Sequence, residues 1–192
     1  MGHGEHLWGS ASLRIPFALR LPGQVAEGRT VEGRARALDV APTLLELLGV
    51  PVPASFRGRS LASLVVAGPH VTAVPDAPAL IETDLWFSDR DGQPYQEVRM
   101  PYPWVYETAT VEAPTGDIAL KPEWEATVEA AKHRGLYLGR WKLLELPTAR
   151  GLKVELYDLT TDPAERRDVA AEHPDVVARL REQLSRERPR AR

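Results

Sequence analysis

The sequence has 192 residues, of which 43% are hydrophobic and 27% charged, and this is enough for one domain with a sizeable core. A formal net charge of −3 argues against nucleic acid as a partner, and the absence of cysteine excludes disulfides, thiolate metal ligands and a cysteine nucleophile within these residues. No apolar run approaches the about 20 residues that a membrane-spanning helix needs, so no membrane partner is expected, and the compartment stays open.

The N-terminal part of the chain predicts a loop and then a strand. Residues 1–12 are rich in Gly, His and Ser, which is typical of a loop. Residues 13–21 alternate in part between apolar and basic side chains and stop at Pro22-Gly23. This pattern predicts a strand that ends at a turn.

Two helices are predicted next. Residues 39–48 contain four leucines at positions that supply apolar faces, with Asp39 as the predicted N-cap and Gly49 as the residue that stops the helix. Residues 60–66 predict a shorter helix. Residues 79–83 then predict a buried strand.

The stretch from residue 86 to residue 124 is the least regular part of the sequence. One strand is predicted within residues 102–111. Flat aromatic rings could stack on sugar faces, whereas a small core that folds the loop is the structural alternative. The stretch contains seven aromatic residues: Trp86, Phe87, Tyr95, Tyr102, Trp104, Tyr106 and Trp124.

The C-terminal part predicts a small sheet with one helix. Residues 133–138 and 141–146 predict a hairpin, residues 152–156 a third strand, and a helix is expected to start near His173-Pro174. The helix should pack on the sheet through apolar residues at helical spacing: Val176, Val177, Leu180 and Leu184.

The connection before that helix carries a turn signal. Asp162 is predicted to cap a helical turn, Pro163 to occupy its first position, and Glu165 to act as the capping-box acid. On the hairpin, Trp141 is expected in the core and Lys142 as a surface charge.

Five segments in this order resemble the sulfatase family, within the alkaline phosphatase superfamily. The last of them, Gly139–Lys142 with Leu156–Leu159 and Asp162–Glu165, is similar to the family's "WK…LYDL…DP-E" signature. The other four are His3-Gly4 with Leu7-Trp8 and Leu13–Pro16 ("HG…LY…RVP"), Leu19–Gly23 ("R-PG"), Asp39–Val50 ("D-APTLL-L-G") and Gly58–Leu61 ("G-SL").

The resemblance implies an α/β fold like the C-terminal part of a sulfatase, with a small antiparallel sheet and helix at its end. Residues 1–85 are expected to be the distal part of the α/β catalytic domain, residues 86–130 an aromatic and proline-rich connecting loop, and residues 131–192 the small C-terminal subdomain. The first part is expected to expose apolar surface that an N-terminal portion would cover.

Sulfate ester hydrolysis needs a nucleophile, a divalent metal ion and cations around the ester oxygens. The resemblance implies a nucleophile in a C/S-x-P-x-R segment, which matures to a formylglycine hydrate, and a calcium-like ion held by acidic pairs. This sequence has no cysteine, no serine with Pro two positions later, and neither acidic pair. The chain is therefore expected to be inactive alone, with the N-terminal portion of the same enzyme as its missing partner.

One substrate contact is implied within the chain. In the family, a Lys or His before the Gly of the "HG…LY" segment contacts the sulfate, and the matching residue is His3, with His6 as a candidate shifted along the chain. An imidazole can supply a cation or a proton near neutral pH. Two alternatives are an exposed, disordered histidine and a metal site made by His3 and His6, which lacks an obvious third ligand.

Asp158 and Asp162 could be read as a catalytic carboxylate pair, but turn formation and capping explain both. The function predicted is thus a C-terminal fragment of an arylsulfatase-like sulfuric ester hydrolase. The alternatives are a phosphate or phosphonate ester hydrolase fragment, which would share this architecture, and a non-catalytic docking or sugar-binding partner.

Overall fold

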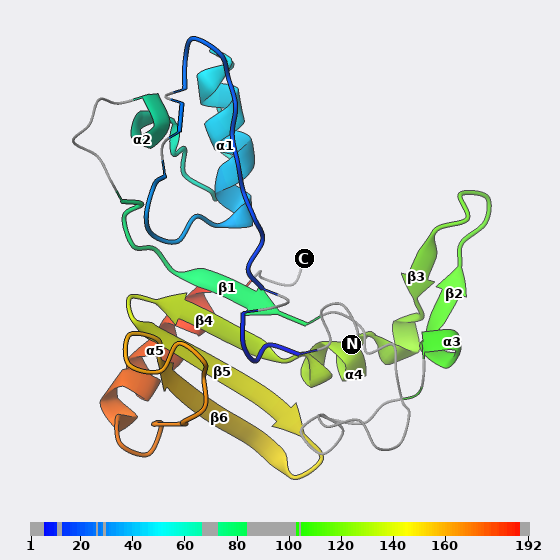
Figure 1. Ribbon diagram of the computed structural model, residues 1–192. Coiled ribbons are helices and arrows are strands. Elements are labelled where there is room, and N and C mark those ends of the chain that lie inside the picture. The colour runs from blue at the N-terminus through cyan, green and yellow to red at the C-terminus, as the bar shows by residue number, and fades with distance from the viewer. Residues whose placement is uncertain are drawn as a thin grey trace. The chain divides into compact units, whose positions relative to one another are not determined.

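The computed structural model describes residues 6–10, 13–25, 27–28, 30–66, 73–83, 103 and 105–188 (Figure 1). The chain divides into two compact units. The first unit contains the chain up to Ile15 and from Pro78 onward, and the second runs from Pro16 to Ala77.

A four-stranded antiparallel sheet is the centre of the first unit. The predicted hairpin and third strand are confirmed, and Gly139 supplies the positive φ of 58° in the turn between β4 and β5. The predicted strand near residue 80 also exists, but it is half-buried and pairs with β4. The strand order is β1-β4-β5-β6, with bounds β1 Ala79–Glu82, β4 Arg134–Leu138, β5 Trp141–Thr148 and β6 Gly151–Asp158.

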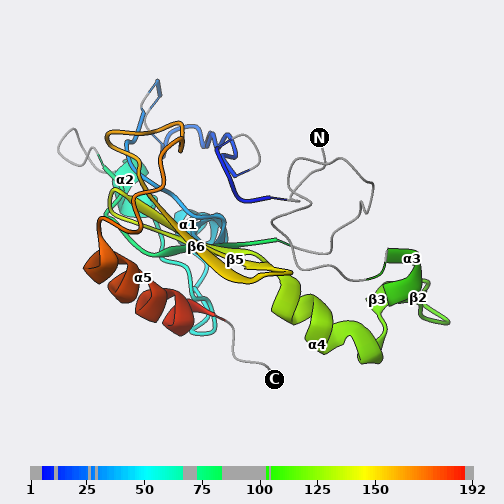
Figure 2. The same cartoon turned by 90° about the horizontal axis from the view of Figure 1, so that it is seen from below.

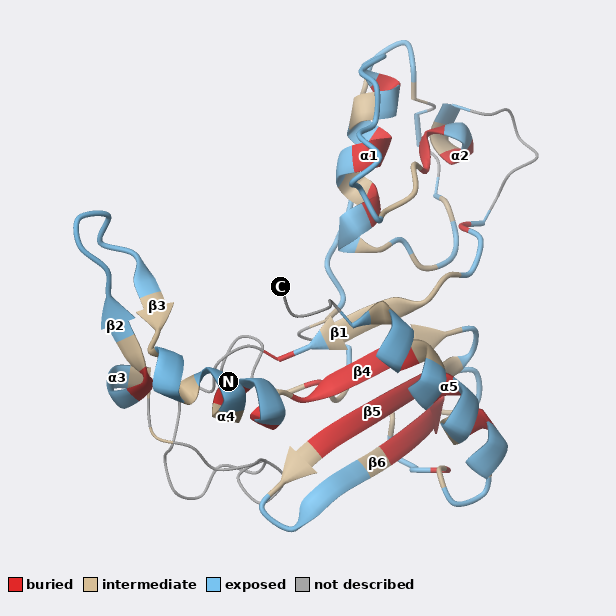
Figure 3. Cartoon of the chain, turned by 180° about the vertical axis from the view of Figure 1, so that it is seen from behind, coloured by how far each residue is buried: buried red, intermediate tan, exposed pale blue. Residues whose placement is uncertain are grey.

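One face of this sheet is covered by α5 (Pro174–Glu187), which lies across β4 and β5 (Figures 1 and 2). Pro174 occupies the first turn, where its missing N–H leaves no hydrogen bond unmade. The predicted apolar stripe is confirmed, because it packs in one buried cluster with alternate residues of three strands. Figure 3 shows the buried parts of β4, β5 and β6 in red beside α5. The buried cluster consists of Leu136, Leu143, Leu156, Val169, Val176, Leu180 and Leu184.

The opposite face of the sheet is covered by a segment from the other end of the chain. Leu7 is 1% exposed and packs with Leu144, Leu146 and Tyr157, the residues of β5 and β6 that alternate with those facing α5. The sequence alone predicts no such contact for residues 6–9.

Residues 105–131 are ordered into α3 (Val105–Thr108), β2 (Ala109–Val111), β3 (Ile118–Leu120) and α4 (Pro122–Ala131). The strand predicted within residues 102–111 is confirmed by β2, which pairs with β3. Helix α4 was not predicted, although Pro122 at its start and acidic residues in its first turn are helix signals. Five of the seven aromatic residues of the stretch, at positions 86, 87, 95, 102 and 104, lie outside the described residues.

The second unit contains α1 (Ala37–Leu47) and α2 (Ala62–Val66), which confirm the two predicted helices. The N-cap of α1 is Arg36, so Asp39 is the third helical residue and supplies the capping-box carboxylate. The prediction of a strand at residues 13–21 is wrong: this segment has no ladder partner among the described residues, and a strand needs one. The turn predicted at Pro22-Gly23 is present. None of the helices that the structure describes has the length and apolarity required to cross a bilayer.

Candidate functional site

The segment that carries His6 is docked on the sheet by its neighbours. The Trp8 indole Nε1 donates to Glu155 Oε2 at 2.6 Å, and the Trp8 ring packs edge-on against the buried His133, with centroids 5.9 Å apart. Leu7 lies in the core beside it. The N-terminal segment is therefore an integral layer of the first unit.

Lys142 is fully buried beneath this segment. Its Nζ donates to Glu165 Oε2 at 2.6 Å, to the carbonyl of Leu7 at 2.5 Å and to the carbonyl of Gly9 at 3.4 Å. The prediction that Lys142 is a surface charge is wrong, and Trp141 is only partly buried, on the α5 face. Residues alternate on a strand, so Lys142 faces the layer that covers the second face.

Glu165 completes the arrangement from a strained turn. Its Oε2 also accepts from the Gly9 N–H at 2.7 Å. The backbone φ of Glu165 is 54°, in the left-handed region that costs a non-glycine residue free energy. The prediction that Glu165 is a capping-box acid is wrong.

No helix forms directly after Asp162. Residues 162–168 are turn and irregular backbone, so the expected role of Pro163 at the start of a helix is wrong too. Asp162 therefore caps no helix, but it stabilises this turn, because its Oδ2 accepts from the N–H groups of Arg166 and Arg167 at 2.7 and 2.8 Å.

Burial and hydrogen bonds shift the pKa values of the groups beside the segment. Burial lowers the pKa of Lys142 below its usual 10.5. The hydrogen bond and charge of Glu165 favour the charged form and offset only part of this effect. Burial alone would raise the pKa of Glu155, but hydrogen bonds from Lys153, Trp8 and Tyr157 outweigh it and hold this pKa below 4.5. Tyr157 therefore has a carboxylate as its acceptor, at 2.7 Å.

The candidate histidines differ in what the structure shows. His6 is half-buried, and its ring lies 6.1 Å from that of Trp8, at a tilt of 33°. His3 lies outside the described residues. Within the part of the chain that the structure describes, no group of three His, Asp or Glu residues could hold a metal ion.

Asp158 has the structural role that the sequence predicts. It forms an ion pair with Arg140 across the β4–β5 turn, with Nε 2.7 Å from Oδ1, and accepts from the N–H of Thr160 at 3.1 Å. These contacts join the hairpin turn to the end of β6 and give Asp158 a structural role.

Asp39 is the corresponding anchor of the second unit. It is 0% exposed and accepts from Arg36 Nη2 at 2.7 Å and from the Arg59 N–H at 2.9 Å. Burial would raise its pKa, but these hydrogen bonds hold the pKa below 3.8. Gly58 is required beside it, because a Cβ there would lie 1.8 Å from the Leu38 carbonyl oxygen. The Asp39–Val50 and Gly58–Leu61 motifs thus contact each other and stabilise the same part of the second unit.

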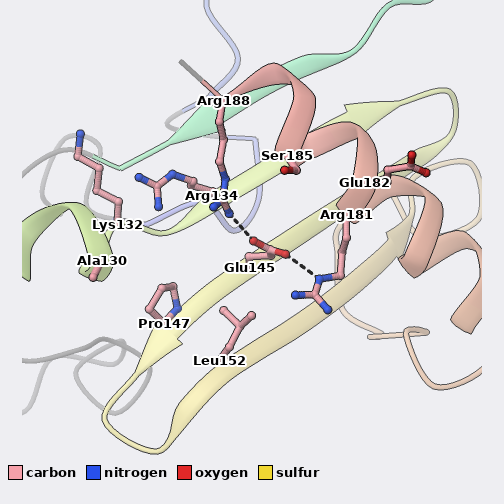
Figure 4. Close-up of a pocket in the computed structure, with 10 residues that line it drawn as sticks. All are labelled: Ala130, Lys132, Arg134, Glu145, Pro147, Leu152, Arg181, Glu182, Ser185 and Arg188. Carbon is pink, nitrogen blue, oxygen red and sulfur yellow. Dashed lines mark hydrogen bonds and ion pairs between the residues drawn. The ribbon is translucent and has the colours of Figure 1, made fainter. Parts of the chain in front are cut away.

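A groove of about 560 Å³ lies between the C-terminal half of α5, the end of α4 and the strands β5 and β6 (Figure 4). Arg181 and Arg188 both pair with the buried Glu145, at 2.7 and 2.5 Å. The other two cations are paired as well: Lys132 with Glu129 at 3.5 Å, and Arg134 with Glu82 at 3.4 Å and with Glu129. Because each cation has a carboxylate partner, the groove is explained as an ion-pair network between α5, α4 and the sheet.

Comparison with known proteins matches residues 5–72 to the family model of the C-terminal region of N-sulphoglucosamine sulphohydrolase. Arylsulfatase K of Bos taurus is 22% identical over 174 residues, which are 91% of this chain and 25% of that protein. The chain thus spans about a quarter of the length of the arylsulfatase K proteins that it matches.

Two solved structures share the fold. Phosphonate monoester hydrolase SpPMH from Silicibacter pomeroyi has a TM-score of 0.53 and 23% identity, covering 88% of this chain and 28% of its own. The structure of BT4656 in complex with D-glucosamine-2-N,6-O-disulfate has a TM-score of 0.50 and 20% identity, covering 87% and 26%. With the ordered motifs, these matches make the chain similar to the C-terminal portion of sulfatases, and the two solved structures show the fold that it shares with them.

Proposed function

We propose that this chain is the C-terminal portion of a sulfatase-like sulfuric ester hydrolase whose nucleophile and metal ligands are supplied by polypeptide outside these 192 residues. One observation carries the proposal: the chain matches arylsulfatase K along 91% of its length while containing no cysteine and no Ser-x-Pro segment. The chain by itself is then inactive, and the calcium-like ion belongs to the complete enzyme.

The exposed apolar surface of the described residues supports this proposal. Most of the large hydrophobic residues that are exposed lie within residues 15–66, as expected if another part of an enzyme covers them. They are Ile15, Phe17, Leu38, Leu44, Leu48, Val50, Val52, Phe56 and Val66. Ile15 is 73% exposed and lies in residues 13–21, the segment whose sequence predicts a strand and which has no strand partner among the described residues.

The test is a complementation assay. The purified chain, given an aryl sulfate and Ca²⁺, is expected to show no turnover. Turnover is expected when the chain is joined to an upstream polypeptide that carries the C/S-x-P-x-R segment and the acidic pairs, encoded by DNA preceding the Met1 codon. Robust turnover by the 192-residue chain alone would refute the proposal.

Within this function, His6 and His3 are the proposed substrate contacts. An imidazole there would donate to an ester or non-bridging oxygen. In the complemented enzyme, His6→Ala and His3→Ala are each compared with His173→Gln, which removes an imidazole that packs on Trp141. The proposed contact is the position whose loss lowers kcat at least 100-fold while His173→Gln retains activity; equal, small effects at both positions would remove both candidates.

A phosphate or phosphonate ester is the second candidate substrate, because the phosphonate monoester hydrolase named above shares the fold. The same complemented protein, given aryl sulfate, aryl phosphate and phenyl phosphonate esters, distinguishes these classes by kcat/KM. A sugar-binding role for the aromatic stretch is the non-catalytic alternative, and binding of a sulfated glycan by the chain alone would favour it.

A further inference from the structure

We infer that Lys142 and Glu165 are positioning residues: they clamp the backbone of residues 7–9 on the sheet and thereby place His6 for substrate. The placing of His6 rests on the proposed function. The clamp itself is defined by the contacts of Lys142 Nζ and Glu165 Oε2 with Leu7 and Gly9.

The clamp is satisfied only when the segment is docked. A lysine ammonium has three donors, and its acceptors here are Glu165 and the carbonyls of Leu7 and Gly9. With the segment in place Lys142 is 0% exposed, so two of its three donors depend on the carbonyls of Leu7 and Gly9 and not on water. A buried ion pair is tolerated only when its remaining hydrogen-bonding capacity is used, so pair and segment depend on each other.

The backbone of Glu165 is a second, independent observation. Glu165 is the one non-glycine residue with positive φ in the part of the chain that the structure describes. A glycine would adopt this φ without strain but would supply no carboxylate to Lys142 and Gly9. Strain retained where a side chain makes buried polar contacts points to a requirement for that side chain.

The clamp acts next to the candidate site. Lys142 binds the carbonyl of Leu7, the residue directly after His6, and the indole of Trp8 donates to Glu155 on the neighbouring strand β6. A displacement of about 1 Å in a group that contacts substrate can cost about 100-fold in rate. The "WK" and "DP-E" motifs thus have a physical role: they fix the N-terminal segment from more than a hundred residues away.

The test uses the complete 192-residue chain, isotopically labelled, with NMR of Gly9 amide exchange and of the His6 ring. Lys142→Met removes the ammonium and keeps most of the stem. The double variant Lys142→Met/Glu165→Gly removes both charges and relieves the positive φ, so no unpaired charge remains buried. The control Arg167→Gln removes the exposed ion pair with Glu172.

In the double variant, Gly9 is expected to exchange at least tenfold faster, and the His6 ring resonances to move to those of an unstructured peptide, while the β4–β5 hairpin keeps its protection. The control should match the unmodified chain. If Lys142→Met unfolds the whole unit, the double variant alone tests whether the clamp docks residues 7–9. Unchanged Gly9 and His6 signals in the double variant, or loss of hairpin protection together with them, would overturn the inference.

This outcome is independent of turnover, because no substrate is present. An undocked segment in the double variant supports the clamp even if the complemented protein hydrolyses no ester, which would count only against the proposed function.

Discussion

The two faces of the central sheet are closed by different chemistry. The face under α5 is closed mainly by leucine and valine from β4, β5, β6 and the helix, with the Glu145 ion pairs at its end. On the opposite face, the apolar contact of Leu7 with β5 and β6 is joined by the buried polar groups of Lys142, Glu155 and Glu165 beneath residues 7–9. Apolar contacts are non-directional and tolerate small shifts, but buried charges require each partner at hydrogen-bond distance. The α5 face therefore provides stability, and the second face fixes the position of one segment.

The largest effect is expected from breaking the Lys142–Glu165 ion pair on the face of the sheet beneath residues 7–9, called the polar face below. Lys142→Met leaves Glu165 buried without its cation, which should cost about 3–5 kcal/mol in the free energy of unfolding. Urea denaturation measures it. A loss below about 1 kcal/mol would mean that Glu165 is readily neutralised or solvated, and that the polar face does not depend on the pair.

A somewhat smaller loss is expected on the apolar face. Leu180→Ala removes a fully buried side chain from α5 and should cost about 2–4 kcal/mol, because the cavity it leaves closes only in part. Unlike Lys142→Met, it should leave Gly9 amide protection, relative to global stability, unchanged. A selective loss of Gly9 protection would show that the two faces are coupled.

Trp8→Phe tests one hydrogen bond of the polar face. It keeps an aromatic ring in the layer but removes the indole donor to Glu155, which retains Tyr157 and Lys153 as partners. About 1 kcal/mol of stability should be lost, and the pKa of Glu155 should rise toward 4.5. A carboxyl NMR titration of Glu155 that does not change would contradict the contact.

Acid should weaken the polar face gradually. The folded pKa of Glu155 lies below 4.5, so the unfolded chain binds more protons as the pH falls past that value. The stabilisation by Glu155 is complete above pH 4.5 and is lost as the pH falls through the folded pKa. Denaturation midpoints measured between pH 6 and pH 3 should fall less steeply in Glu155→Gln than in the unmodified chain.

The smallest effect is expected at the surface of α5. Arg186 pairs with Glu182, and both side chains are about two-thirds exposed. Arg186→Gln should change the free energy of unfolding by less than about 0.5 kcal/mol, because solvent and salt screen exposed pairs. A larger loss would show that charge on the outer side of α5 matters to the fold.

The local patterns of the sequence determined the α5 face. Helical spacing of Val176, Leu180 and Leu184 and alternation in the hairpin predict which residues meet, since both periods are properties of a single element. The same reasoning found the α1 and α2 helices, and the family motifs predicted the sulfatase-like fold. For the candidate site it supplied His3 and His6.

Only the tertiary structure decided the second face. Alternation places Lys142 opposite Trp141, but whether that face meets water or a covering layer depends on residues 7–9, more than a hundred positions away. For the same reason the strand expected at residues 13–21 is absent, because a strand requires a partner that no local pattern supplies. Glu165 matched a capping motif by spacing, and only its backbone conformation and the buried ammonium show its actual role.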